Sequence, residues 1–366
     1  MNGTHILELF RNQLADEIAR RDDDCPRFFP LNINPWLAMS LMQKAVRRGR
    51  EDLALGAAAT LLKVSPDRLW RRLCVTAYED IGVADFDLVA LVTVAMKGKR
   101  FRAEIGGEWE VAGHLIERMC RSAKCRAADD LLVVCEQHEG LELARLDLTF
   151  QPLPDLIRLI SSGGDLRERA LAFWYAIGTD RCPSPVLRSR KGDYHVVFDA
   201  LCEAGFAESV VEVCREGFRK CNEVLPPFLI LLEQEARHAK RHDEPDDLPA
   251  EALIGNIPCW AYDMHVREGN QALGRFINEG GLFARWFREN ASLARARKPA
   301  GNLLFRVESG LVDRRLHWKI GIGLRDQADV WCCGFDPKLA PEGLALLRAD
   351  LPRLNEARRH VTANLR

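Results

Sequence analysis

The sequence lacks the motifs that identify several large classes of enzyme and membrane protein. It has no G-x-x-x-x-G-K-[ST] string, so nothing in it predicts a loop that holds nucleotide phosphates. A G-x-S-x-G elbow, an H-E-x-x-H string and a dinucleotide-binding fingerprint are also absent. No apolar run approaches the roughly 20 residues that span a bilayer, and the N-terminus lacks the basic-then-apolar order of a signal peptide. We therefore expect a cytoplasmic protein that does not bind membranes.

Cysteine pairs at the spacing of zinc ligands are missing as well; Cys332-Cys333 and Cys120-x4-Cys125 do not have it. The chain of 366 residues has 12 cysteines but no C-x-x-C pair, the usual spacing of zinc ligands. Most of them have apolar neighbours in helix-like segments, which is typical of buried reduced thiols. Cys182 lies in a polar loop beside Arg181, so we expect it to be the most exposed; a nucleophile there needs a distant histidine, such as His195. We expect neither a metal nor another cofactor.

The chain as a whole has no large excess of positive or negative charge, but the charges are unevenly distributed along the sequence. The net charge is −1. From Trp286 to the C-terminus the chain has 15 Lys and Arg against 9 Asp and Glu, so the preceding part has 37 against 44. A basic C-terminal part suits contact with nucleic acid or with an acidic partner. The alternative is that its arginines only solvate helix faces.

The apolar pattern predicts a mainly α-helical protein made of several multi-helical bundles. Alternating residues at 303–309 and 315–324 indicate a small β-hairpin near the C-terminus, although both segments also suit helix. Loop-like stretches divide the chain into four expected domains, which are an N-terminal helix and linker (1–35), a helical domain (36–140), a second helical domain (141–250) and a basic C-terminal domain (251–366).

The stretch 37–85 has the clearest local signals. Ser65 caps a helix whose first position is Pro66, where the missing N–H costs nothing. Gly82 stands where a glycine ends a helix, and Asp85 caps the next one. These signals predict short helices that end in an acidic turn.

Three strings in this stretch resemble a known family, the MgsA/RarA/Werner-helicase-interacting AAA+ proteins of replication-associated recombination. The strings are Gln43-Lys44-Ala45-Val46-Arg47-Arg48-Gly49, Arg71-Arg72-Leu73 and Tyr78-Glu79-Asp80-Ile81-Gly82-Val83-Ala84-Asp85. The resemblance covers roughly residues 36–135 and concerns the family's C-terminal helical region, which assembles subunits. The family's ATPase module has no counterpart here, and its Gln-Lys-Ser is Gln-Lys-Ala.

The resemblance implies a helical bundle related to the collar of clamp loaders, detached from its motor. Within it, eight residues are expected to be structural, namely Gln43, Lys44, Arg71, Arg72, Glu79, Asp80, Gly82 and Asp85. We expect Glu79 to pair with Arg71 or Arg72, and Asp80 or Asp85 to cap the following helix. A metal on the adjacent carboxylates is disfavoured, since neighbours at a helix end do not share a face.

Clustered cations provide candidate contacts with DNA phosphates. The candidates are Lys97, Lys99, Arg100, Phe101, Arg102, Arg188, Arg190, Lys191, Arg314 and Arg315. Phe101 is included because an aromatic ring among cations can stack on an unpaired base. Lys44, Arg47 and Arg48 form a further basic group.

A polar cluster near residue 265 is the strongest candidate for chemistry. It contains Asp263, His265, Arg267 and Glu268. On a helix His265 and Glu268 share a face, but Asp263 does not point the same way. The preferred interpretation is a helix start capped by Asp263, with a general base as the alternative.

Together these features predict a non-catalytic accessory protein of DNA replication, recombination or repair. It is expected to form a homo-oligomer and to contact DNA or a replication-fork protein. One alternative is a protein-interaction module that binds or mimics a fork-associated AAA+ ATPase without touching DNA. A second alternative is an enzyme that uses the His265 cluster.

Overall fold

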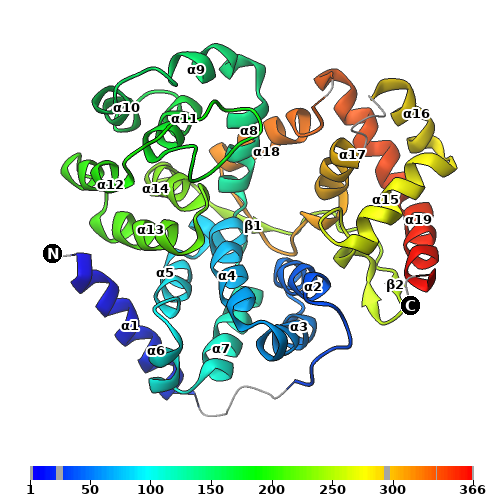
Figure 1. Cartoon of the computed structure of the whole chain (residues 1–366), viewed down its shortest axis with the longest axis horizontal. Coiled ribbons are helices and arrows are strands. Elements are labelled where there is room, and N and C mark those ends of the chain that lie inside the picture. Colours follow the sequence, from blue (N-terminus) through cyan, green and yellow to red (C-terminus); the bar gives the residue numbers. More distant parts are fainter. Residues whose placement is uncertain (1–2, 22–27, 292–296, 335, 365–366) are drawn as a thin grey trace. The chain divides into compact units, whose positions relative to one another are not determined.

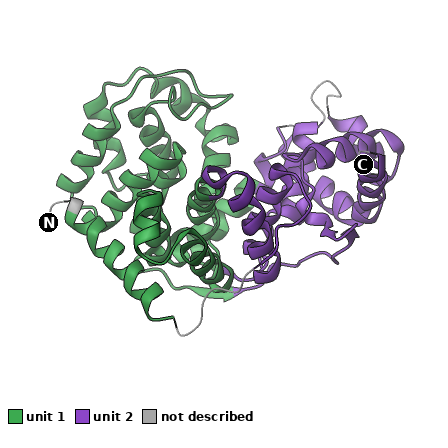
Figure 2. Cartoon of the chain, turned by 60° about the horizontal axis from the view of Figure 1, so that its bottom comes forward, with its two compact units in different colours: residues 1–26, 70–243, 316–328 green, residues 27–69, 244–315, 329–366 purple. Residues whose placement is uncertain are grey.

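Figure 1 shows a computed structural model of the chain, which describes residues 3–21, 28–291, 297–334 and 336–364. These residues form mainly α-helices, as the sequence predicts, with two small two-stranded sheets. The chain divides into two compact units, shown in Figure 2. Unit 1 contains residues 1–26, 70–243 and 316–328, and unit 2 contains residues 27–69, 244–315 and 329–366. Each unit thus combines distant segments, whereas the four expected domains are contiguous. Residues 22–27 of the expected linker lie outside the described ranges.

Unit 1 is built from the helices of the first two thirds of the chain. They are α1 (Gly3–Ala19), α4 (Pro66–Thr76, in this unit from Trp70), α5 (Phe86–Ala95), α6 (Lys99–Glu104), α7 (Glu108–Arg121), α8 (Ala127–Gln137), α9 (Glu142–Asp147), α10 (Leu153–Ile160), α11 (Leu166–Ile177), α12 (Tyr194–Glu203), α13 (Glu208–Cys221), α14 (Leu225–Ala236) and most of α18 (Lys319–Trp331). Helix α13 packs against α14, and α1 packs against α5 and α13 (Figure 1).

Tyr78 is fully buried in unit 1. Its hydroxyl lies 2.8 Å from Thr93 Oγ1 and donates to the carbonyl oxygen of Val213 at 3.0 Å. Burial raises the pKa of Tyr78 well above its usual value. A Cβ at Gly217 would lie 2.1 Å from this hydroxyl oxygen, so a glycine in α13 permits the approach.

Unit 2 is built from a helical hairpin near the N-terminus and from the last third of the chain. Its elements are α2 (Pro35–Arg47), α3 (Glu51–Val64), β2 (Leu253–Ile254), β3 (Ile257–Pro258), α15 (Arg267–Glu279), α16 (Leu282–Asn290), α17 (Arg297–Leu304) and α19 (Ala340–Asn364). Helix α2 starts as its sequence dictates, because the Asn34 side chain accepts a hydrogen bond from the N–H of Leu37 at 2.9 Å and Pro35 fills the first turn. The α2–α3 contact buries small side chains such as Ala57.

A β-hairpin is present, but the two segments that we expected do not form it, and of them only residues 315–317 are a strand. Strands β2 and β3 pair in antiparallel register, with Leu253 opposite Pro258. Residues 303–309 instead end α17 and form the π-helix Phe305–Ser309. Residues 319–324 begin α18, where a Cβ at Gly321 would lie 2.3 Å from Nε1 of Trp318. Gly321 is therefore explained by the close packing of the Trp318 indole. In the sequence, the same glycine argues against a helix and so favours a strand.

The charged run after α14 contains the first strand of the other sheet. We expected residues 237–249 to be a solvated helix end and a linker. They contain β1 (His242–Glu244), which pairs with β4 (Arg315–His317). Hydrophilic side chains on both strands hide this pairing from a hydrophobicity pattern.

Candidate functional site

The acidic turn of the family-like string forms the π-helix Ala77–Ile81 at the end of α4. Its Asp80 is fully buried, and the carbonyl oxygen of Asp80 accepts a hydrogen bond from the N–H of Cys125 at 2.8 Å. Gly82 follows with φ +52°, and a Cβ there would lie 2.7 Å from the carbonyl oxygen of Cys125. The turn between α7 and α8 thus packs directly on the π-helix, an element that often marks functional sites.

Arg126, at that turn, binds the acidic residues of the π-helix. Its guanidinium forms ion pairs with Asp80, with Glu79 at 3.3 Å and with Asp129 at 2.6 Å, and 1% of its side chain is exposed. Burial opposes the charged form, but the carboxylates more than offset it, so the pKa of Arg126 is raised. These carboxylates therefore bind the Arg126 cation and do not form a vacant metal site. Sequence reasoning assigned no role to Arg126.

The remaining family-like residues of unit 1 are placed as follows. Asp85 caps α5, as predicted, by accepting a hydrogen bond from the N–H of Leu88 at 3.0 Å. Arg71 is exposed and Arg72 is half-buried on α4. Both lower the pKa of Glu223, although burial outweighs them and raises it.

Unit 2 contains a similar arrangement around its own π-helix, Phe305–Ser309. Arg47 donates to the carbonyl oxygen of Ser309 at 2.8 Å, and Arg48 donates to that of Glu308 at 2.8 Å. The Glu308 carboxylate in turn binds Arg358 at 2.6 Å, with 1% of each side chain exposed. The two arginines that follow Lys44 therefore hold α2 to α17 and its π-helix, and are not placed as a phosphate-binding surface.

Lys44 and Asp263 form a buried ion pair at 2.7 Å. Lys44 also donates to Oγ of Ser40 at 2.6 Å, and the neighbouring Gln43 is buried too. Burial alone would raise the pKa of Asp263, but Lys44 and the His265 backbone N–H stabilise the carboxylate and lower it overall. The pair locks α2 to the segment before α15.

The other members of the polar cluster do not converge. Asp263 precedes α15 by several residues, and its carboxylate accepts the N–H of His265 at 2.9 Å. The His265 side chain and Arg267 are exposed. Glu268 accepts a hydrogen bond from Asn34 at 3.0 Å. Polar groups hold this helix start, but the prediction that Asp263 caps α15 is wrong, because the N-terminal cap is Val266 and the Asp263 carboxylate accepts a hydrogen bond before the helix begins.

The expected basic turn at 97–102, most of which forms the start of α6, contains two buried residues. Phe101 is 8% exposed, and the ammonium of Lys97 lies 5.3 Å from its ring centroid. Arg102 is 7% exposed, donates to the Glu108 carboxylate at 2.7 Å and lies 4.0 Å from the ring centroid of Trp70. As placed, Phe101 offers little of its ring to a base, and Arg102 serves packing.

Three cations of that turn remain at the surface. Lys97, Lys99 and Arg100 are exposed. Arg100 forms a one-turn ion pair with Glu104 at 3.0 Å, which at such exposure contributes little to stability. These three side chains are the part of the cluster that can reach a phosphate.

The loop between α11 and α12 combines exposed cations with an exposed aromatic ring. Arg188 and Lys191 are exposed, and Arg190 is half-buried and donates to the carbonyl oxygen of Thr149. The guanidinium of Arg188 lies 5.7 Å from the ring centroid of Phe150, which is 73% exposed. Sequence reasoning missed Phe150, which lies far from the loop in sequence; its polar surroundings in the string Asp147-Leu148-Thr149-Phe150-Gln151-Pro152 were the available signal.

Of the neighbouring Arg314 and Arg315, one is exposed and the other is buried. Arg314 is exposed. Arg315 is 8% exposed and binds both carboxylate oxygens of Asp246, at 2.8 and 2.7 Å. A bidentate buried pair of this kind fixes the backbone of β4 and engages Arg315 within the protein.

Cys182 is buried, contrary to expectation. It is 6% exposed, and burial raises its pKa to about 12 although Arg181 opposes the rise. Its Sγ lies 3.6 Å from the carbonyl oxygen of Asn222. A thiol in this state is a poor nucleophile at neutral pH.

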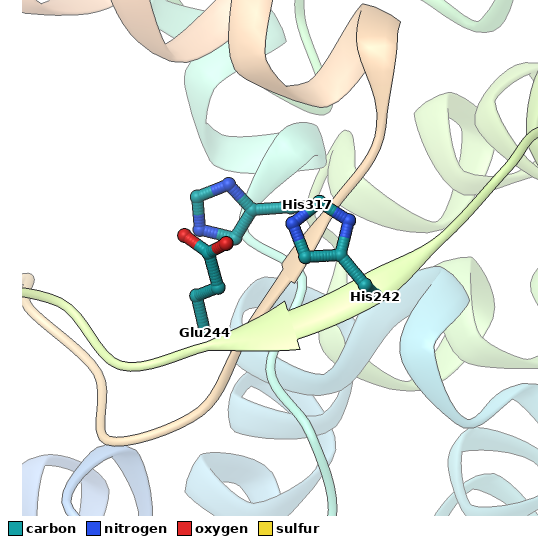
Figure 3. A group of neighbouring side chains, drawn as sticks. All are labelled: His242, Glu244 and His317. Carbon is teal, nitrogen blue, oxygen red and sulfur yellow. The ribbon is translucent and has the colours of Figure 1, made fainter.

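A group of potential metal ligands lies on the β1–β4 sheet. His242, Glu244 and His317 each offer a ligand atom, and these atoms lie within 4.8 Å of one another (Figure 3). Sequence reasoning looked for cysteine pairs and so missed this group, although the H-x-E spacing at 242–244 places two ligands on one face of a strand.

The chain matches no protein-family model, no curated protein and no solved structure. No helix among the described residues combines the length and apolar character needed to cross a membrane.

Proposed function

We propose that this protein is a non-catalytic accessory protein of DNA replication, recombination or repair that self-associates and contacts DNA. The observation that carries the proposal is the exposed Phe150 ring beside Arg188, with Lys191 on the same loop. The resemblance of residues 36–135 to the helical region of fork-associated AAA+ proteins suggests the process in which it acts.

An exposed phenylalanine among cations suits single-stranded nucleic acid. An unpaired base stacks on an aromatic face, with about 1–3 kcal/mol per base, while neighbouring cations contact the backbone. Arg188 and Lys191 have no ion-pair partner among the described residues, so a phosphate displaces no carboxylate. The nearby Asp193 is engaged as the N-terminal cap of α12, where it accepts the N–H of His195 at 3.1 Å.

The experiment compares Phe150→Ala with Leu143→Ala in mobility shifts on single-stranded, duplex and forked DNA. Both side chains are about three-quarters exposed, at 73% and 75%, so the second substitution controls for the loss of exposed apolar surface. We expect Phe150→Ala to weaken single-strand binding about fivefold or more, with less effect on duplex, and Leu143→Ala to have no effect. Equal binding by the two variants contradicts the stacking role.

A second candidate function has its own observation. Leu143, Leu146 and Phe150, spaced three and four residues apart on and just after α9, are 75%, 41% and 73% exposed. Exposed apolar side chains at helical spacing suit a protein partner. This observation favours the protein-interaction module, which binds or mimics a fork-associated ATPase. If Leu143→Ala and Phe150→Ala both abolish capture of such a partner and neither changes DNA binding, this candidate replaces the first.

Self-association is the second part of the proposal. The resembling family region holds subunits together, so we expect a dimer or tetramer at micromolar concentration. Multi-angle light scattering of the full chain gives the mass directly; a mass equal to one chain of 41.4 kDa removes this part of the proposal. We also expect no ATP hydrolysis, since no phosphate-binding loop occurs in the sequence.

A further inference from the structure

We propose that His242, Glu244 and His317 bind a divalent transition-metal ion, and that Zn²⁺ is the ion that suits them best. Strand β1 carries His242 and Glu244, and strand β4 carries His317. Figure 3 shows the three side chains gathered on one side of the paired strands. This inference does not rest on DNA binding and adds a site that the proposed function does not use.

The geometry of the group follows from the strands themselves. Residues two apart on a strand point to the same face, so the position of Glu244 relative to His242 is set within β1. Pairing with β4 brings the ring of His317 alongside that of His242, with centroids 5.4 Å apart and planes 27° apart. In Figure 3 the carboxylate of Glu244 lies against the ring of His317.

The distances fit a first-row ion after a small adjustment. Zn²⁺ lies about 2.0–2.2 Å from nitrogen and oxygen ligands, so tetrahedral ligand atoms are roughly 3.3 Å apart. The three ligand atoms here lie within 4.8 Å of one another, and rotations of exposed or half-exposed side chains close that difference. Two imidazoles and one carboxylate leave a fourth position for water, as in open zinc sites.

The donor set also selects among ions. Imidazole nitrogens suit Zn²⁺ and other transition metals, whereas Mg²⁺ and Ca²⁺ require mainly oxygen ligands. Two of the three donors of this site are nitrogens, so we expect Mg²⁺ and Ca²⁺ to compete poorly.

Both ends of the strand pair are held by contacts that do not involve the ligands. On the side of unit 2, the N–H of Asp246 donates to the carbonyl oxygen of Val312 at 3.1 Å, and Asp246 binds Arg315 in the bidentate pair described above. These bonds hold the residues that follow β1 and the first residue of β4. The backbone next to the ligands is therefore held in place by contacts other than the metal.

Two contacts within unit 1 hold Leu316 of β4 and Arg241, the residue before β1. The N–H of Leu316 donates to the carbonyl oxygen of Lys124 at 2.8 Å, and Arg241 donates to that of Val83 at 3.4 Å. A metal shared by β1 and β4 would cross-link two strands that are far apart in sequence. Its expected effect is to stabilise the folded chain, since an ion that binds only the folded state shifts the unfolding equilibrium.

The test uses the full chain after removal of metals with a chelator. Calorimetric titration with Zn²⁺ should show one site, and titration with Co²⁺ should give the strong visible absorption of a four-coordinate ion. His317→Gln, His242→Gln and Glu244→Gln should each weaken Zn²⁺ binding by more than about a hundredfold, beyond the roughly 10–100-fold that loss of an outer-shell partner causes. His238→Gln is the matched control, because His238 is an exposed histidine four residues before His242.

Unchanged Zn²⁺ affinity in the three ligand variants overturns the proposal, because cysteines or other histidines must then hold the ion. Weak Co²⁺ absorption like that of the ion in water overturns it as well. Circular dichroism without metal should be the same for every variant and the parent. If a histidine variant does not fold, the nearly isosteric Glu244→Gln decides the matter alone, by the same loss of affinity or its absence.

Discussion

Replacing Arg126 should destabilise the protein far more than replacing an exposed arginine. Arg126 is 1% exposed at its side chain and pairs with the fully buried Asp80 and with Glu79 and Asp129. Arg126→Met removes the cation but leaves these carboxylates, and an uncompensated buried charge costs about 3–5 kcal/mol. For a unit of 150–250 residues that corresponds to a Tm lower by roughly 6–20 °C.

The assay is thermal and urea unfolding followed by circular dichroism. Arg100→Met is the control, because Arg100 has 95% of its side chain exposed and forms only a one-turn pair with Glu104; its expected effect is about 0.5 kcal/mol or less. Adding Asp80→Asn to Arg126→Met should recover part of the loss, since it removes the most deeply buried of the carboxylates that pair with Arg126 in the parent. If Arg126→Met unfolds with the same midpoint as Arg100→Met, the buried cluster does not stabilise the turn as we infer.

Two further predictions concern the same kind of contact. Gly82→Ala should lower the free energy of unfolding by about 1–3 kcal/mol, because φ is +52° and the new Cβ would lie 2.7 Å from the carbonyl oxygen of Cys125; Gly163→Ala, with open space around it, should be neutral in the same urea titration. The lowered pKa of Asp263 means that its ion pair stabilises the fold above the ordinary pKa of 3.8 and that this contribution is lost as the pH falls through the lower folded value. Asp263→Asn should therefore lose less stability than the parent when acidified from pH about 4 to about 2.

Two results would contradict these predictions. Equal midpoints for Gly82→Ala and Gly163→Ala would mean that the acidic turn relaxes without cost. An Asp263→Asn variant with the same acid sensitivity as the parent would mean that other carboxylates dominate the acid response.

Local signals in the sequence predicted local structure well. A capping residue acts within about three positions, so the role of Asp85 could be judged from neighbouring residues alone. The mainly helical fold follows from many such signals, because helix-spaced apolar residues recur along most of the chain. The apolar pattern predicts helices at 165–177 and 207–221, and α11 (Leu166–Ile177) and α13 (Glu208–Cys221) each begin one residue later and end at the expected residue.

Contacts between distant residues could not be predicted in the same way. Arg126 meets Asp80, and His317 meets His242, only because the topology brings separate segments together. Nothing within a few positions of either residue encodes the partner.

Exposure depends on the fold for the same reason. Phe101 lies among basic residues and yet is 8% exposed, whereas Phe150 follows a segment of mixed apolar and charged residues and is 73% exposed. The residues next to a side chain in the sequence do not determine its exposure, because residues from other segments of the fold can cover it. The candidate base-stacking residue therefore moves from Phe101 to Phe150.

The salt dependence of DNA binding tests the central claim most directly. The affinity of the full chain for a single-stranded oligonucleotide should fall linearly in a plot of log affinity against log salt, by about 0.7 per phosphate contact. Replacing Arg188 and Lys191 with alanine should flatten that slope by about 1.4, because two contacts are lost. The proposed contact with DNA is contradicted if the parent does not bind the oligonucleotide at low salt, or if the double variant stays folded and retains the slope of the parent.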